Sequence, residues 1–295
     1  MKDVLIIGSQ GKLGAGLFNK MKSRAIGTSR RGSSQKSVFH FDLLDHDSIQ
    51  NLFNVSTLKF AVLVAAISDP DECFINQKLS KAINVDAPIE ILKILKKKNI
   101  KPIYISTEMV FDGEKGFYSE LDKPNPTLIY GKQKLKVEEF IQRHFRDYII
   151  IRLSKIYSER NNDNSILNSF YSDITSNRVA RYARDQYFTP TLQNDFELAV
   201  LSLIDKNLSG IYHLSSGFRI NRWHFFELFA KRIGNFGKVK PCILSDITFL
   251  ERRPMDLSLN GDRLSKATDI KFATPIVGID KWININNPRS INAKQ

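Results

Sequence analysis

The chain has 295 residues, of which 42% are apolar and 25% charged, the balance of an ordinary soluble globular protein with one extended domain or two smaller ones. Its formal net charge of +13 comes from scattered basic residues, so we expect no nucleic-acid partner, although a phosphorylated substrate and cofactor would suit this charge. Two cysteines, Cys73 and Cys242, make neither a disulfide framework nor a metal site. We find no signal peptide and no apolar stretch near the roughly 20 residues that span a bilayer, and so expect a cytoplasmic protein without a membrane segment.

The first predicted elements are a strand, a glycine-rich turn and a helix. Residues 3–7 are an apolar run, Gly8, Gly11 and Gly14 follow in the pattern G-x-x-G-x-x-G, and a helical pattern continues to Met21. Glycines at this spacing permit a tight turn and let the backbone approach a pyrophosphate, which a helix N-terminus attracts. The turn therefore predicts a dinucleotide site. Its expected contacts are Gly8, Gln10, Gly11, Lys12, Leu13 and Gly14.

The end of the second predicted strand, residues 25–29, indicates which dinucleotide is bound. Ser29 is followed by Arg30 and Arg31, where an acidic residue would bind the ribose hydroxyls of NAD. Arginine suits the additional phosphate of NADP, so we expect NADP(H) in preference to NAD(H). Further cofactor contacts are expected after the third strand (38–41) and the fourth (60–64). They are Asp42, Leu43, Ala65 and Ala66, in addition to Ser29, Arg30 and Arg31, with Tyr130 and Lys134 later in the chain.

The remaining pattern predicts an α/β protein. Helices are expected at 46–53, 84–98, 166–174, 195–204 and 223–233, strands at 102–105, 148–152 and 210–214, and an irregular loop at 184–191. Alternating strands and helices predict a Rossmann-type, doubly wound parallel sheet with a smaller C-terminal α/β substrate-binding part. We place the cofactor domain at 1–155, with about 192–215 returning to it, and the substrate-binding part at 156–191 and 216–295.

Tyr130 and Lys134 are the main candidate catalytic residues. They are four residues apart in a helical segment, so both side chains lie on one helix face. An ammonium beside a phenol stabilises phenolate and would lower the pKa of Tyr130, which could then exchange a proton with a carbonyl or hydroxyl. Thr107, after the strand at 102–105, could donate a hydrogen bond to the same substrate oxygen. Tyr-x-x-x-Lys also occurs by chance in many helices, and its weight here comes from the glycine turn.

Several short motifs in a fixed order resemble those of the extended short-chain dehydrogenases/reductases. Within that family they are most similar to the dTDP-4-dehydrorhamnose reductases and related sugar-nucleotide reductases. The matching pieces span most of the chain: residues 8–14, 41–43, 64–66, Asn84, 106–113, 130–134, Arg152, 185–186, 190–191 and 253–259.

The resemblance implies an NADPH-dependent reductase of a 4-keto sugar nucleotide, active in dTDP-rhamnose and polysaccharide biosynthesis. A hydride would go to the keto carbon and a proton from Tyr130 to its oxygen, while Lys134 would hold the nicotinamide ribose and Thr107 would orient the carbonyl. The implied substrate contacts are Thr107, Glu108, Gln186 and Arg253. Neither the residues nor the resemblance implies a metal.

Relatives with other functions remain as alternatives. Sugar-nucleotide dehydratases carry Thr-Asp-Glu where this chain has Thr107-Glu108-Met109, so dehydration is disfavoured, but reductases usually have Thr-Asp-Tyr there. Phe188 stands where reductases often have glycine, in a loop expected to meet the sugar. A sugar-nucleotide epimerase with bound NAD is disfavoured by Arg30 and Arg31. A non-catalytic regulatory subunit, like that of methionine adenosyltransferase, stays open, and so does a homodimer.

Overall fold

The computed structural model describes residues 2–33, 35, 37–45, 47–48, 57–160, 165–176 and 178–286. The helix predicted at 46–53 falls almost wholly outside these residues. The chain forms two compact units. The first comprises Met1–Phe111, Lys123–Arg152 and Val200–Tyr212, and the second comprises Asp112–Asp122, Leu153–Ala199 and His213–Gln295. Within the described residues, no helix is long and apolar enough to cross a membrane.

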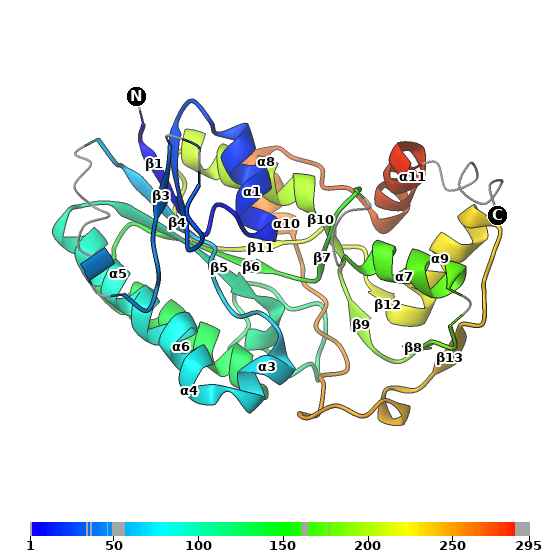
Figure 1. Ribbon diagram of the computed structural model, residues 1–295. Helices are drawn as coiled ribbons and strands as arrows, with labels where there is room; N and C mark the ends of the chain where they lie inside the picture. Colours follow the sequence, from blue (N-terminus) through cyan, green and yellow to red (C-terminus); the bar gives the residue numbers. More distant parts are fainter. Residues whose placement is uncertain are drawn as a thin grey trace. The chain divides into compact units, whose positions relative to one another are not determined.

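A seven-stranded sheet forms the centre of the first unit (Figure 1), with the strand order β11-β6-β5-β4-β1-β2-β3. The pairs β1–β2, β2–β3, β1–β4 and β4–β5 are parallel. The predicted doubly wound sheet is thereby confirmed, and the strand order reverses between β1 and β4, where such folds bind ligands beyond the carboxyl ends of the strands. The strands are β1 Val4–Ile7, β2 Ala25–Ser29, β3 Val38–His40, β4 Phe60–Leu63, β5 Lys101–Thr107, β6 Ile149–Leu153 and β11 Gly210–Leu214.

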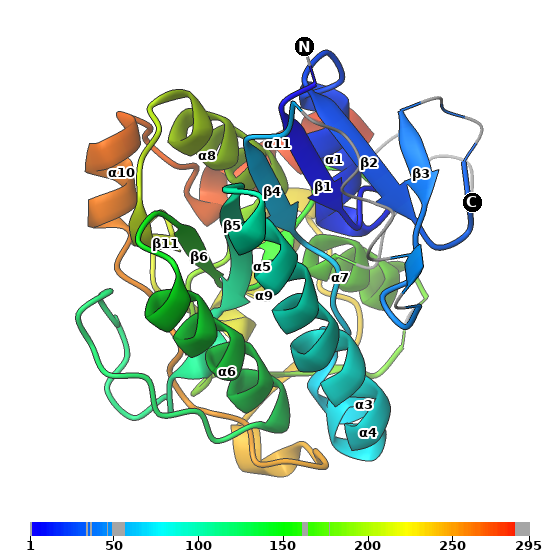
Figure 2. The ribbon, with the colours of Figure 1, turned by 90° about the vertical axis from the view of Figure 1, so that its left-hand side faces the viewer.

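Helices cover both faces of this sheet, with α1 on one face and α5 and α6 on the other (Figure 2). The core between the sheet and α5 and α6 includes Leu5, Leu63, Leu92 and Ile141, all fully or almost fully buried. Apolar residues at helical spacing on α5 and α6 thus meet apolar strand residues. The helices are α1 Lys12–Lys20, α3 Pro70–Ile75, α4 Gln77–Lys81, α5 Ala87–Lys97, α6 Ile129–His144 and α8 Gln193–Asp205, of which α8 runs from the second unit into the first.

The helix predicted at 84–98 begins earlier than the sequence pattern indicated. Helical structure starts at α4 and passes through a π-helical turn, Ala82–Asp86, before α5. Pro88 lies at the start of α5 and has no N–H to donate to the carbonyl four residues earlier, while its ring would crowd that carbonyl. The wider π turn accommodates this proline, and such turns are frequent at functional sites.

The second unit is held together by an aromatic core and three two-stranded ladders, β10–β7, β12–β9 and β13–β8. The rings of Phe170 and Phe225 pack edge to face with centroids 5.5 Å apart, and those of Phe229 and Trp282 at 5.0 Å. The irregular loop predicted at 184–191 contains short strands. The elements are β7 Ile156–Tyr157, α7 Ile166–Thr175, β8 Arg181–Ala183, β9 Tyr187–Phe188, β10 Thr191–Leu192, β12 Ile220–Asn221, α9 Arg222–Ile233, β13 Lys240–Cys242, α10 Asp262–Thr268 and α11 Pro275–Asn286.

Candidate functional site

The glycine-rich turn joins β1 to α1 at the point where the strand order reverses. Gly8 has φ +95°, and a Cβ on it would lie 2.9 Å from the backbone nitrogen of Ala65, just after β4. A Cβ on Gly14 would lie only 2.1 Å from the carbonyl oxygen of Gly8, so the turn can close only with glycine at both positions. The N-terminus of α1, capped by Gly11, has no side-chain cap and no acidic residue in its first turn. Backbone N–H groups and the helix dipole there suit a pyrophosphate.

The loop after β2 exposes two cations. The Ser29 hydroxyl donates to the carbonyl of Gly32 and accepts from the backbone N–H of Arg31, which closes a short turn. Arg30 and Arg31 are both exposed, and the sequence places no acidic residue between Ser29 and Ser33. Asp42 and Leu43, expected beside an adenine, are half-buried after β3, and the Asp42 carboxylate accepts from the backbone N–H of Leu44. The predicted cofactor residues outside α6 therefore lie at or just after the ends of strands β1 to β4 of this sheet.

The N-terminal turn of α6 packs directly against the backbone that follows β5. A Cβ on Gly131 would lie 2.0 Å from the carbonyl oxygen of Met109, inside the short 3-10 turn Glu108–Val110. The N–H of Asn125 also donates to the carbonyl of Val110. This close approach, which only glycine permits, brings Tyr130 beside Glu108 at the end of β5.

Tyr130 and Lys134 lie one turn apart on α6, and both are buried, with 7% and 3% of their surface exposed. The Lys134 ammonium nitrogen sits 4.2 Å from the centre of the Tyr104 ring, an attractive arrangement for a cation. The Thr107 hydroxyl oxygen accepts from the N–H of Met109 at 3.2 Å, so the hydroxyl proton can be directed to another acceptor.

The electrostatics of the pair differ from the expectation based on spacing. Burial raises the pKa of Tyr130, and the nearby Glu108 carboxylate raises it further. Burial also lowers the pKa of Lys134 to about 7, although the Glu138 carboxylate opposes this shift. The expected lowering of the Tyr130 pKa by Lys134 is therefore wrong for this structure. Removing both groups from water disfavours both phenolate and ammonium.

A buried amide network, which the sequence reasoning missed, joins α6 to the loop after β4. Asn84, on the π turn, pairs both side-chain ends with the backbone of Ile67, at 2.9 Å each. Its amide also donates to Gln133 of α6 at 2.8 Å, and Gln133 donates in turn to Ser80. The loop that carries Ala65 is thus tied to the helix of Tyr130. Gln133 is separated from its partners by about fifty residues, so no local pattern reports the contact.

The predicted substrate residues Gln186 and Arg253 belong to the second unit. The Gln186 side chain accepts from the Arg222 guanidinium at 3.0 Å and donates to the carbonyl of Pro254 at 3.2 Å. The Arg253 guanidinium lies 4.9 Å from the centre of a phenylalanine ring. Phe188, at the position where reductases often have glycine, is 3% exposed and packs in the aromatic core of this unit.

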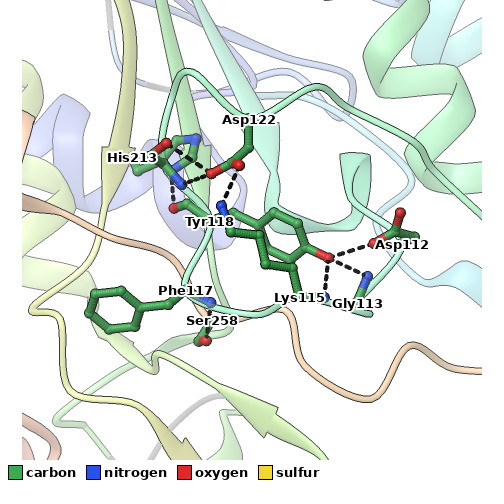
Figure 3. Close-up of polar contacts among 9 residues, drawn as sticks. Asp112, Gly113, Lys115, Phe117, Tyr118, Asp122, His213 and Ser258 are labelled. Carbon is green, nitrogen blue, oxygen red and sulfur yellow. Dashed lines mark hydrogen bonds and ion pairs between the residues drawn. The ribbon is translucent and has the colours of Figure 1, made fainter.

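A polar cluster in the second unit organises the loop after Phe111 (Figure 3). The Tyr118 phenol donates to Asp112 and accepts from the backbone N–H groups of Gly113 and Lys115. The N–H of Phe117 donates to Ser258 at 2.7 Å, and the backbone of Tyr118 pairs with residues 258 and 260. The loop is thereby fastened to a segment about 140 residues later in the chain.

The family model described as the RmlD substrate binding domain matches residues 1–284. The chain belongs to this family. The resemblance inferred from the short motifs is thus confirmed.

Proteins similar to this chain carry different descriptions. A Haloferax volcanii protein named "Probable low-salt glycan biosynthesis reductase Agl14" is 27% identical over 84% of this chain and 86% of its own length. Methionine adenosyltransferase 2 subunit beta of Danio rerio is 28% identical over 72% of this chain and 68% of its own. A solved structure of a hypothetical dTDP-4-dehydrorhamnose reductase from Sulfolobus tokodaii has a TM-score of 0.84, with 28% identity over 95% of this chain and 98% of that one.

Proposed function

We propose that the chain is an NADPH-dependent reductase of a 4-keto sugar nucleotide, with Tyr130 as the proton donor. The observation that carries this proposal is the buried pair of Tyr130 and Lys134, which the Gly131 contact holds beside Glu108 and the end of β5. The family match and the reductase names of similar proteins support the reaction class.

The raised pKa of Tyr130 keeps the phenol protonated but makes it a weaker acid, so the transfer relies on the Lys134 ammonium to stabilise the phenolate that forms. At neutral pH the phenol keeps its proton, so it can donate a hydrogen bond to a keto oxygen and then release the proton to the developing alkoxide. A hydroxyl such as that of Thr107 can donate a second hydrogen bond to the same oxygen. Glu108, buried beside Tyr130, disfavours phenolate and so keeps the donor protonated until the transfer.

The fit of the first unit to a dinucleotide rests on the glycine turn, whose backbone a Cβ would block, and on the acid-free N-terminus of α1. When bound, NADPH supplies the hydride. Residues 8–14 would hold its pyrophosphate, Ala65 and Ala66 would allow close approach, and Lys134 would hold the nicotinamide ribose. Arg30 and Arg31 favour NADPH over NADH because a guanidinium pairs with the additional phosphate.

The test is oxidation of NADPH, followed at 340 nm, with dTDP-4-dehydrorhamnose. We expect wild-type turnover and a loss of at least roughly 10²-fold in Tyr130→Phe, which removes only the proton donor. Tyr148→Phe is the matched control, because this half-buried tyrosine of the same unit lies beyond the C-terminus of α6. Equal activity of Tyr130→Phe and wild type would exclude Tyr130 as the donor.

A second candidate is a non-catalytic NADP-binding subunit of another enzyme. It is favoured by the similarity to methionine adenosyltransferase 2 subunit beta. In that case the chain binds NADPH, measured by the quenching of its fluorescence, yet consumes none with any keto-sugar nucleotide. Turnover that depends on Tyr130 would exclude this candidate.

A further inference from the structure

A buried charged cluster lies on the same face of α6 as the two candidate catalytic residues. Glu138 follows Lys134 by four residues, just as Lys134 follows Tyr130, so the three side chains form one row along the helix. Glu138 is fully buried. A carboxylate removed from water in this way is costly unless donors surround it.

Three donors from two strands surround the Glu138 carboxylate. The Arg152 guanidinium of β6 contacts both oxygens, with its Nε at 3.1 and 3.2 Å and a terminal nitrogen at 2.7 Å. The Ser106 hydroxyl of β5 donates to the same carboxylate. Arg152 is itself 2% exposed, so the pair is closed to water. Ser106 immediately precedes Thr107 in β5, so the cluster adjoins the candidate catalytic residues.

The groups around Lys134 come from three elements. Tyr104 of β5 provides the ring beneath the ammonium, Cys73 of α3 lies nearby with a raised pKa of about 11, and Glu138 extends from α6 itself. The Tyr104 phenol keeps its proton and carries no charge. Of the groups that favour the ammonium, Glu138 has the largest effect and Cys73 a smaller one.

We propose that Glu138, held by Arg152 and Ser106 one helical turn beyond Lys134, is a positioning residue whose buried carboxylate favours the charged form of Lys134 in a site closed to water. Lys134 can then stabilise the phenolate that Tyr130 becomes after giving up its proton. This role rests on the proposed reductase function for its consequence in catalysis, but the effect on Lys134 is a property of the chain itself.

The decisive measurement is the pH titration of Lys134, followed by NMR of ¹³C at its ε carbon in the full chain without added nucleotide. The signal is assigned by its loss in Lys134→Met. Wild type should titrate near pH 7, and Glu138→Gln should shift the midpoint down by about one pH unit, because the amide keeps the shape of the side chain but loses its charge. Glu139→Gln, an exposed neighbour on the same helix, should leave the midpoint unchanged.

Glu138→Gln leaves the buried Arg152 guanidinium facing a neutral amide, which destabilises the folded chain. A second variant therefore keeps the test valid if Glu138→Gln does not fold. The double variant Glu138→Leu/Arg152→Met removes both charges, a replacement that often preserves stability. The double variant decides the outcome: a downward shift of the Lys134 midpoint supports the proposal, and an unchanged midpoint overturns it. In the reductase assay the loss of activity at alkaline pH should begin at lower pH in these variants. If the wild type reduces no keto sugar, the proposed function fails while the titration still decides the role of Glu138.

Discussion

The contact of Gly131 with the carbonyl of Met109 should control where Tyr130 lies. In Gly131→Ala the new Cβ would be 2.0 Å from that oxygen, whereas ordinary van der Waals contact begins at 3.4 Å, so helix and turn must separate by about 1.4 Å. Alanine favours a helix interior over glycine by about 1 kcal/mol, which offsets part of the cost. Overpacking of this kind costs typically 1–3 kcal/mol, and a misplacement near 1 Å can lower turnover by about 10²-fold.

The assay combines thermal unfolding with NADPH oxidation at saturating substrate. We expect a net loss of stability of about 1 kcal/mol, with a much larger proportional loss of kcat. Lys132→Ala, an exposed change in the same helical turn, should alter stability by less than about 0.5 kcal/mol and leave kcat intact. A Gly131→Ala protein with unchanged kcat would show that the close packing of α6 on the turn after β5 does not position Tyr130.

Three further variants test other parts of the argument. Tyr118→Phe removes three hydrogen bonds of the phenol and should lower the free energy of unfolding by about 1–3 kcal/mol in urea titrations; an unchanged midpoint would contradict the role of that cluster. In the folded chain the pKa of Lys134 is about 7, below its ordinary value of 10.5. Between these two values the unfolded chain binds more protons than the folded chain, so this residue makes the free energy of unfolding rise with pH. The stability advantage of Lys134→Met over wild type should therefore shrink from pH 7 towards 10, and a constant difference would refute the shift. Arg30→Ala should raise the KM for NADPH roughly tenfold or more and leave that for NADH unchanged, since a charged hydrogen bond to phosphate is lost; equal effects on both would contradict the assignment of the additional phosphate to Arg30.

The sequence by itself determined the architecture of the first unit. Apolar runs of strand length, the glycine spacing after β1 and helical periodicity are local properties, and each predicts the same doubly wound sheet. The positions of Tyr130 and Lys134 on one face of α6 follow from the period of the helix alone. The motifs also sufficed to recognise the family that the later match confirmed.

Tertiary structure decided what depends on burial and on contacts between distant residues. The pKa of Tyr130 rises because the helix is packed into a site closed to water, and no spacing of residues reports that desolvation. The loop 112–122 belongs to the second unit because Tyr118 pairs with a segment 140 residues away. The contacts of Glu138 with Ser106 and Arg152 likewise join three elements. Such pairings depend on how the strands are ordered in the sheet, which local periodicity does not encode.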